Sequence, residues 1–349
     1  MTCEVSFLPV GNADSIVIHA DDSVVVVDLG KNPRFIYNWL RKRNLNRIDR
    51  IYITHNHRDH FPFSSLKKLA DFLELWFSDG SEIKIFSLPL GIYRDAYNKL
   101  NDLEQSDRQT YQELKDAMDR LDDWDLIGKP KSVPVFYDPT PYSLANLKIY
   151  ALHPRQLFIE RHKGKINETS LVLQAVYGEF AVLLLSDLEG EGLKDYLTVV
   201  KADSLINQGV RANIVKIPHH GGFPPNGDDL KELLALIDAE LAVLCVGSTN
   251  PYGHVEPELF KALIELQNNN AKRLKQFICT DVTRTCIHSA SVRVGMKKTG
   301  LSSSKKCAGE ITIVADISGK WELKVETLDH PSQVASFAHA ACMGRAELD

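Results

Sequence analysis

The chain has 349 residues, of which 44% are hydrophobic and 25% are charged, a composition typical of globular proteins. Its net charge of −5 excludes the overall basic footprint of a general nucleic-acid-binding protein. No apolar run approaches the roughly 20 residues that cross a bilayer, and the first residues lack the basic and apolar parts of a signal peptide. We therefore expect a cytoplasmic protein with no membrane segment.

Short strands and helices alternate along the first part of the chain. Runs rich in β-branched residues predict strands at 4–9, 15–19, 24–28, 50–54 and 83–87. A helix is expected to include residues 38–42. Apolar side chains at three- and four-residue spacing predict another helix over 64–77.

The segment after residue 90 is acidic. From 95 to 125 it carries ten acidic and four basic residues, a net −6, which leaves the rest of a chain of −5 at about +1. We interpret 93–127 as one or two amphipathic helices, part of an insertion at about 90–130, and as a possible surface for a protein partner. Four prolines between 130 and 141 then indicate a loop.

A second set of strands and helices follows. Strands are predicted at 148–152, 169–176, 180–186, 214–217 and 241–246, with helices at 190–207, 228–238 and 256–268. The tail predicts strands at 311–315 and 321–325 and a helix near 331–342. This order indicates an α/β fold, an αββα sandwich of two mixed sheets with helices outside. We expect one domain over 1–270 and a C-terminal strand-helix extension, 271–349, packed on it.

The strongest functional signal is the group His55, His57, Asp59 and His60, directly after the strand at 50–54. We call residues 55–60 the histidine segment. Residues i and i+2 of an extended chain point to the same side, so His55 and His57 can reach one metal ion. Asp59 and His60, where the chain turns, can face a second ion. Imidazole and carboxylate ligands suit zinc, manganese or iron, and two close ions can activate one water.

The pattern His55-x-His57-x-Asp59-His60 resembles the signature of the metallo-β-lactamase superfamily. The segments around it resemble the competence-type branch of that superfamily, the hydrolase-like domain of the DNA-uptake protein ComEC. Six spaced blocks agree with that branch in order between residue 5 and about 260. They are Val10-Gly-Asn-Ala-Asp14-Ser15, Val27-Asp28-Leu-Gly30, Asn167-Glu-Thr-Ser170, Leu185-Ser-Asp187-Leu-Glu189, Lys216-Ile-Pro-His219-His220-Gly221 and Asn250-Pro-Tyr-Gly253-His254.

The resemblance implies a metallo-β-lactamase fold with two metal sites. His55 and His57 would bind the first metal; the second would be bound by Asp59, His60 and His220, and Asp187 would bridge the two. We choose His220 because the last histidine of the family directly precedes a glycine. The remaining residues of the blocks would support the ligands or contact substrate: Asp14, Asp28, Asn167, Lys216 and His219.

Three positions depart from the family pattern. Asn167 stands where many members place a further histidine on the first metal, so that site is expected to be looser or completed by water. Phe61-Pro62-Phe63 replaces Ile-Gly-Gly after the histidine segment, and Val255 replaces proline after His254. In the tail, the spacing of Cys279, Cys286, His288 and Cys307 matches no usual zinc knuckle, so we expect core or edge cysteines there.

The implied chemistry is hydrolysis by a metal-bound hydroxide. Asp59 would orient or deprotonate the nucleophile, and His254 would protonate the leaving group or hold a phosphate oxygen. We expect a phosphodiesterase or nuclease with two divalent zinc or manganese ions and a nucleic-acid or nucleotide substrate. Two alternatives stay open. One is a hydrolase of a small ester, lactone or thioester; the other is a docking subunit of a multi-protein complex, with defence against foreign DNA as a possible setting.

Overall fold

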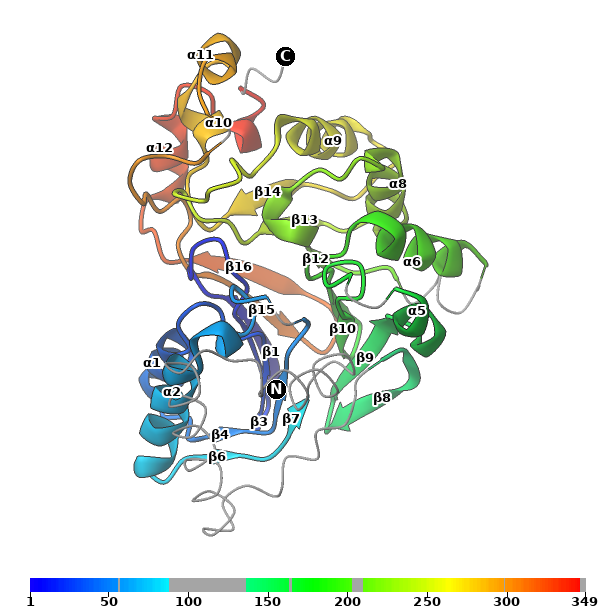
Figure 1. The fold of residues 1–349 in the computed structure, drawn as a ribbon, viewed down its shortest axis with the longest axis vertical. Coiled ribbons are helices and arrows are strands. Elements are labelled where there is room, and N and C mark those ends of the chain that lie inside the picture. The colour runs from blue at the N-terminus through cyan, green and yellow to red at the C-terminus, as the bar shows by residue number, and fades with distance from the viewer. Residues whose placement is uncertain (56, 88–135, 163–164, 203–209, 298, 346–349) are drawn as a thin grey trace.

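The computed structural model describes residues 1–55, 57–87, 136–162, 165–202, 210–297 and 299–345 (Figure 1). The insertion expected at about 90–130, with the partner surface at 93–127, lies outside the described residues. No helix within the described ranges has the length and apolarity that a bilayer crossing requires.

Two seven-stranded sheets form the centre of the described structure. The first has the order β16–β15–β1–β2–β3–β5–β7 and the second the order β14–β13–β12–β11–β10–β9–β8. The first sheet contains β1 (Thr2–Phe7), β2 (Ile16–Ala20), β3 (Ser23–Val27), β5 (Arg50–Tyr52), β7 (Phe86–Ser87), β15 (Ile311–Asp316) and β16 (Trp321–Val325). The second contains β8 (Asp138–Leu144), β9 (Leu147–His153), β10 (Val172–Tyr177), β11 (Phe180–Leu184), β12 (Ile214–Lys216), β13 (Leu241–Leu244) and β14 (Gln276–Cys279). A small separate ladder pairs β4 (Arg47–Ile48) with β6 (Glu82–Ile83).

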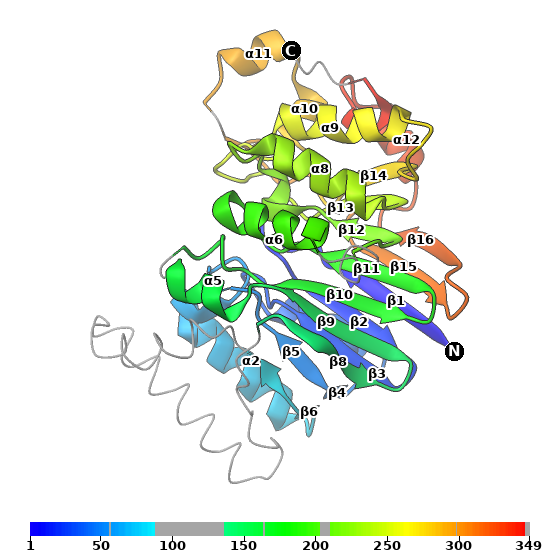
Figure 2. The ribbon, with the colours of Figure 1, turned by 90° about the vertical axis from the view of Figure 1, so that its right-hand side faces the viewer.

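Helices cover the outer faces of both sheets, as Figure 2 shows. Two helices lie on the first sheet, α1 (Arg34–Lys42) and α2 (Leu66–Ser78). Three lie on the second, α6 (Gly190–Ala202), α8 (Gly227–Ile237) and α9 (Pro257–Asn268). The shorter helical segments are η1 (Pro62–Ser65), α5 (Gln156–Arg161), η3 (Pro218–Gly221), α10 (Arg284–Ile287), α11 (Ala290–Val294), α12 (His330–Ala335) and η4 (Ala341–Met343).

The alternation of side chains along each strand explains this layering. In β3, Val25 and Val27 point into the cluster between the sheets, whereas Val24 and Val26 pack under α1 and α2. In β13, Leu241 and Val243 face inward while neighbouring residues pack under the outer helices. Strands buried on both faces require continuous apolar runs, which is what the sequence contains there. The predicted αββα sandwich is confirmed.

Strands from beyond residue 270 belong to both sheets. β15 pairs with β1 in antiparallel register, from Thr2 opposite Asp316 to Phe7 opposite Ile311, and β14 extends the second sheet beside β13. The boundary expected at residue 270 therefore does not separate two sets of strands. The tail cysteines Cys279, Cys286 and Cys307 are buried as free thiols in the core under the outer helices.

The structure differs from the sequence prediction at several elements, four of which have a clear physical reason. The proline-rich segment expected as a loop contains β8, because prolines are tolerated in an edge strand at an irregularity, and the ladder to β9 shifts between Asp138 and Tyr142. α5 and β14 were not predicted, since six and four residues are too short for a clear period. The helix expected over 331–342 is two separate turns, α12 and η4, whose buried residues mimic a helical pattern.

One edge of the sandwich gathers the predicted site residues. β3 and β5 are parallel neighbours in the first sheet, and β11, β12 and β13 are parallel neighbours in the second. The segments after these strands contain Asp28, the histidine segment, Asp187, the His219–His220 pair and His254. Parallel strands end at a common edge, and that edge is the usual place for ligand sites in such sheets.

Candidate metal centre

Asp28 fixes the start of the histidine segment. Its Oδ1 accepts a hydrogen bond from the backbone N–H of Thr54 at 2.7 Å, and its Oδ2 accepts one from the Thr54 hydroxyl at 2.7 Å. The same Oδ2 lies 2.7 Å from Nδ1 of His60, which donates to it. Because Nδ1 carries that proton, Nε2 of His60 is left to face the site. Asp28 therefore positions a side chain and does not itself enter the cluster.

His55, His57 and Asp187 form the first group of candidate ligands. Their nearest nitrogen and oxygen atoms all lie within 4.8 Å of one another. Nε2 of His55 is 3.8 Å from Oδ2 of Asp187, and the rings of His55 and His57 meet edge to face at 4.9 Å between centroids. The predicted convergence of these two histidines on one side of the chain is what the structure contains.

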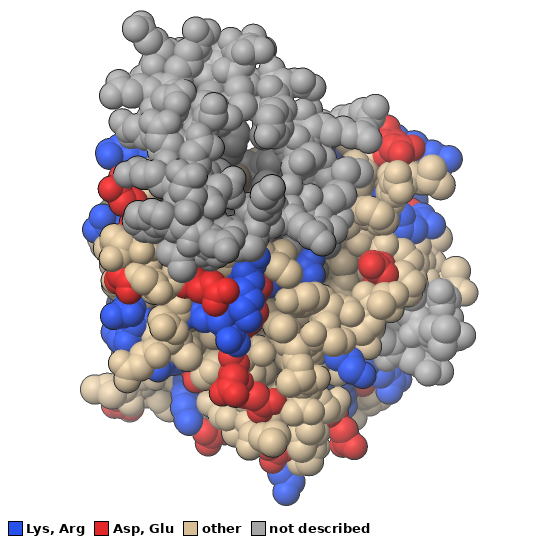
Figure 3. All heavy atoms as spheres, turned by 90° about the horizontal axis from the view of Figure 1, so that it is seen from below, with Lys and Arg blue, Asp and Glu red and all other residues tan. Residues whose placement is uncertain are grey.

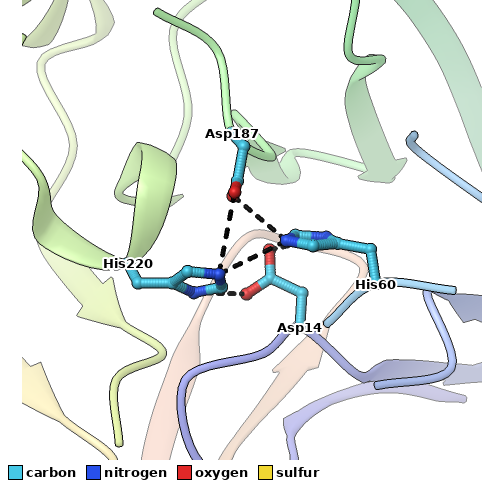
Figure 4. A group of neighbouring side chains, drawn as sticks. All are labelled: Asp14, His60, Asp187 and His220. Carbon is cyan, nitrogen blue, oxygen red and sulfur yellow. Dashed lines mark hydrogen bonds and ion pairs between the residues drawn. The ribbon is translucent and has the colours of Figure 1, made fainter. Parts of the chain in front are cut away.

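Asp14, His60, Asp187 and His220 form the second group, and all four are buried (Figure 4). Nε2 of His60 lies 3.2 Å from Oδ1 of Asp187 and 3.3 Å from Nε2 of His220. Nδ1 of His220 donates to the backbone oxygen of Cys245 at 2.9 Å, which turns its Nε2 toward the group. Asp187 thus belongs to both groups, and it comes from the segment directly after β11.

Asp59 lies beside the second group. Its Oδ2 is 3.6 Å from Nε2 of His220, and its side chain is 19% exposed. The sequence analysis placed Asp59 among the ligands of the second metal and gave Asp14 a supporting role. In the structure Asp14 is a member of the converging group, and Asp59 stands at its solvent side.

Lys216 is buried beneath the cluster. Its Nζ forms an ion pair with Asp14, donates to the backbone oxygen of Ser186 at 2.9 Å and lies 3.9 Å from Oδ1 of Asp187. Burial alone would lower the pKa of Lys216, but Asp14 and Asp187 raise it above the ordinary value. Lys216 was expected either to support the ligands or to contact substrate; its side chain has no exposed surface and pairs with carboxylates of the protein, as a supporting residue does.

A second network connects Asn167, Glu189 and His219. The Asn167 amide donates from Nδ2 to Oε1 of Glu189 at 2.7 Å, and Nδ1 of His219 lies 2.8 Å from Oε2 of the same carboxylate. Burial would lower the pKa of His219, but its hydrogen bond to Glu189 raises it. The sequence analysis quoted Glu189 in the block that contains Asp187 but gave it no role, because no local pattern shows that its carboxylate meets Asn167 and His219.

His254 lies next to the His219–His220 turn and outside both groups. Its ring centroid is 5.3 Å from that of His219, and a Cβ on Gly222 would come within 3.1 Å of its imidazole. The Asn250 amide holds its backbone, accepting from the N–H of His254 at 2.9 Å and donating to its carbonyl at 2.8 Å. The close approach explains why a residue without a side chain occupies position 222.

The buried donor set fits a metal ion. Among the described residues, Nε2 of His55, Oδ1 of Asp187 and Oδ1 of Asp14 are buried without a hydrogen-bond partner. Burial, and after it His60, lowers the pKa of His55 well below its ordinary value, so His55 is neutral and can act as a ligand. Burial would also lower the pKa of His60, but Asp187, Asp28 and Asp14 raise it well above the ordinary value. In the metal-free protein the extra proton of His60 and the ammonium of Lys216 therefore balance the buried carboxylates of Asp14, Asp28 and Asp187, and a metal ion that displaces that proton would take over its charge.

The two adjacent histidines after β12 are expected to differ in their effect. His220→Ala should lower the bound metal per chain and reduce any metal-dependent hydrolysis by about 100-fold, because a ligand atom is lost. His219→Ala removes only a hydrogen-bond partner of Glu189 and should cost about tenfold. Elemental analysis together with steady-state rates measures both. Equal effects of the two substitutions would contradict the assignment of His220.

Comparison with known proteins gives one family match, over the N-terminal part of the chain. The family model described as the metallo-beta-lactamase superfamily matches residues 8–61, a segment that contains Asp14, Asp28 and the histidine segment. A comparison with curated proteins finds no sequence match.

Three solved structures are among those similar to this chain. The metallo-beta-lactamase fold protein YhfI from Bacillus subtilis is 9% identical, with a TM-score of 0.38, and the match covers 70% of this chain and 86% of that protein. A diphosphatase of the PhnP family is 13% identical with a TM-score of 0.38, covering 70% and 87%. The short form of human tRNase Z is 16% identical with a TM-score of 0.38, covering 68% and 91%. Over residues 8–61 this chain is therefore similar to the metallo-beta-lactamase superfamily, and the αββα layers of the described structure agree with the fold that this similarity implies.

Proposed function

We propose that the protein is a metal-dependent phosphodiesterase that acts on nucleic acid. The observation that carries the proposal is the pair of ligand groups that share Asp187 and offer only nitrogen and oxygen atoms. Such ligands suit zinc or manganese, and two ions of this kind are a recurring arrangement in phosphodiester hydrolysis. The sequence blocks that resemble the competence-type branch support the same substrate class, and we place the chain near that branch as part of the proposal.

His55, His57 and Asp187 would hold one ion, and Asp187, His60 and His220 the other. Asp14 and Asp59 lie on opposite sides of the second group, Asp14 against the buried Lys216 and Asp59 toward solvent. When bound, the ions would lower the pKa of a water and stabilise negative charge on the phosphate oxygens.

Residues next to the two ligand groups would orient the water and transfer protons. Burial would raise the pKa of Asp59, but the hydrogen bond from His220 and the nearby His60 lower it below its ordinary value, so the carboxylate is charged and we assign to it the orientation of the attacking water. His254 and His219 lie together at the next rim position. We assign His254 to proton donation toward the leaving oxygen, and we assign to Glu189 the role of holding His219 and Asn167 in place.

The test is metal reconstitution of chelator-treated protein. We expect manganese or zinc to restore hydrolysis of bis-p-nitrophenyl phosphate and of single-stranded DNA or RNA, and metal at about 100 times its Kd to raise the unfolding free energy by about 2.7 kcal/mol. Parallel assays with lactone and thioester substrates test the alternative that the protein hydrolyses a small carboxylic ester. Metal binding without cleavage of any phosphodiester would overturn the proposal.

A variant of the first group provides the matched comparison. His57→Ala is expected to reduce the bound ions from two to one, measured by elemental analysis of the loaded protein. His19→Ala, on β2 and outside both groups, should leave the metal content unchanged. If His57→Ala retains full metal content, the first group is not a metal site.

The charge distribution bears on how a substrate is recognised. On the face seen in Figure 3, acidic and basic side chains of the described residues are interspersed, with no basic stripe among them. Recognition of a polyanion is therefore expected to be local, near the metal centre. The acidic segment 93–127 stays a proposed surface for a protein partner on sequence grounds alone.

A further inference from the structure

A cavity of about 560 Å³ lies between α5 and α6. The two helices lie side by side in both ribbon views (Figures 1 and 2). From α6 the lining residues are Glu191, Lys194, Asp195 and Thr198, which share one helix face at i, i+3, i+4 and i+7. The volume is within the range of small-ligand sites in proteins.

Both walls of the cavity begin at the sheet edge that holds the candidate metal centre. β9 and β11 are both antiparallel to β10, so they run parallel to each other and end at the same edge of the sheet. β11 leads to Asp187, and β9 leads to Arg155 at the start of α5. Their ends are two strand spacings apart, about 10 Å. α6 begins at Gly190, three residues after Asp187, so one wall of the cavity starts at the metal cluster.

The wall formed by α5 is aromatic and apolar. Phe158 and His162 stack in parallel, with centroids 4.0 Å apart and 16° between planes. Tyr137 and Leu157 also line the cavity, and Leu157 is 65% exposed although it is apolar. Phe158 is only 6% exposed and its ring is covered by His162, so the half-buried rings of His162 and Tyr137 are the surfaces on which a base can stack, with little dependence on sequence.

Cations surround this apolar wall. The charged residues that line the cavity have a net charge of +1, from Arg155, Arg161 and Lys194 less Glu191 and Asp195. Arg155 is paired with Asp195, and Lys194 lies 4.0 Å from Glu191. Within the described part of the chain, Arg161 has no ion-pair partner. A guanidinium without an ion-pair partner, next to an aromatic wall, is suited to bind a phosphate group.

We propose that the α5–α6 cavity binds one nucleotide of a single-stranded nucleic acid, the nucleotide next to the phosphodiester at the metal centre. The base lies against the aromatic wall, and its phosphate contacts Arg161 and Lys194. A single strand is required because bases in a duplex are already stacked and cannot enter. The inference rests on the proposed phosphodiesterase function for its substrate, and on the cavity for its location.

The test is binding of fluorescein-labelled oligothymidylate to chelator-treated protein, followed by anisotropy over a salt series. Arg161→Gln combined with Lys194→Gln is expected to weaken binding about tenfold and to reduce the salt slope by about 1.4, since two phosphate contacts are lost from a single strand. Tyr137→Ala should weaken binding about fivefold or more through lost stacking. Lys201→Gln is the matched control on the same helix, because Lys201 pairs with Glu232 of α8 and does not line the cavity.

The outcomes separate the two proposals. If wild-type protein binds the oligonucleotide and the cavity variants bind equally well, the cavity is not the subsite, whatever the loaded enzyme cleaves. If binding depends on Arg161, Lys194 and Tyr137 but no phosphodiester is cleaved with manganese or zinc, the subsite stands and the proposed function fails. Wild-type protein that binds no oligonucleotide would overturn the subsite as well. If Lys201→Gln weakens oligonucleotide binding as much as the cavity variants do, the effect comes from the overall charge of the protein, and the subsite is overturned as well.

Discussion

Asp187→Asn is expected to lower kcat/KM for phosphodiester hydrolysis by about 10³-fold or more. Among the described residues, Asp187 is the one side chain that belongs to both ligand groups. The amide that replaces it has no charge and binds transition metals weakly. Losing several kcal/mol of stabilisation at two metals corresponds to a factor of this size.

The charge state of Asp187 supports the same expectation. Burial would raise its pKa, but His60 and His220 hold it well below the ordinary value, so the carboxylate is charged and ready to bind a cation. Metal content per chain should fall with the rate, and both are measured on the same preparation. Asp228→Asn, at a fully exposed carboxylate on α8, is the control and should change neither. An Asp187→Asn enzyme that keeps both its metal and its rate would remove the basis for a shared ligand.

The sequence predicted the part of the site that is contiguous. His55, His57, Asp59 and His60 stand within six residues after an apolar strand, so their convergence follows from local geometry. Asp187 follows an apolar run and so is expected at a strand end, but its role, like that of His220, came from the family blocks, because nothing local shows that β11 and β12 end beside β5. The structure brings these strand ends together across the two sheets.

The rest depended on packing that no local pattern contains. Asp14 stands in a short loop between β1 and β2, and its place in the second group follows from the approach of the two sheets at one edge. Lys216 stands at a strand end, where its charge alone does not show that it is buried. It follows Ile214 by two positions, and so its side chain points to the same interior face. Glu189 became visible only through its contacts with Asn167 and His219.

The strands of the fold also divide into those that a local pattern predicts and those that depend on their place in the sheet. Long apolar runs such as β3 and β11 were predicted because burial on both faces leaves a continuous signal. β8 was not, since Pro139 and Pro141 indicate a loop until the edge position of the strand is known. β14 was missed because four residues carry no period of their own, and its strand character comes from the parallel pairing to β13.

Lys216→Met is expected to lower the free energy of unfolding of the metal-free protein by about 3–5 kcal/mol. The substitution keeps an unbranched side chain that is only one atom shorter, but it leaves Asp14 and Asp187 buried without their ammonium, and breaking a buried pair from one side costs about that much. Denaturant unfolding of chelator-treated protein measures the loss. Lys201→Met removes a half-exposed ion pair with Glu232 and should cost less than about 1 kcal/mol.

The double variant decides whether the ion pair itself is responsible. Replacing Asp14 and Lys216 together, with leucine and methionine, should cost clearly less than the sum of the two single losses, because neither charge is then left alone. Added manganese should stabilise Lys216→Met more than wild type, since Asp14 is released to the ligand group that contains His60, Asp187 and His220. Additive losses in the double variant would show that Asp14 and Lys216 do not act as a pair. Equal stabilisation of both proteins by manganese would show that Asp14 belongs to Lys216 and not to the metal.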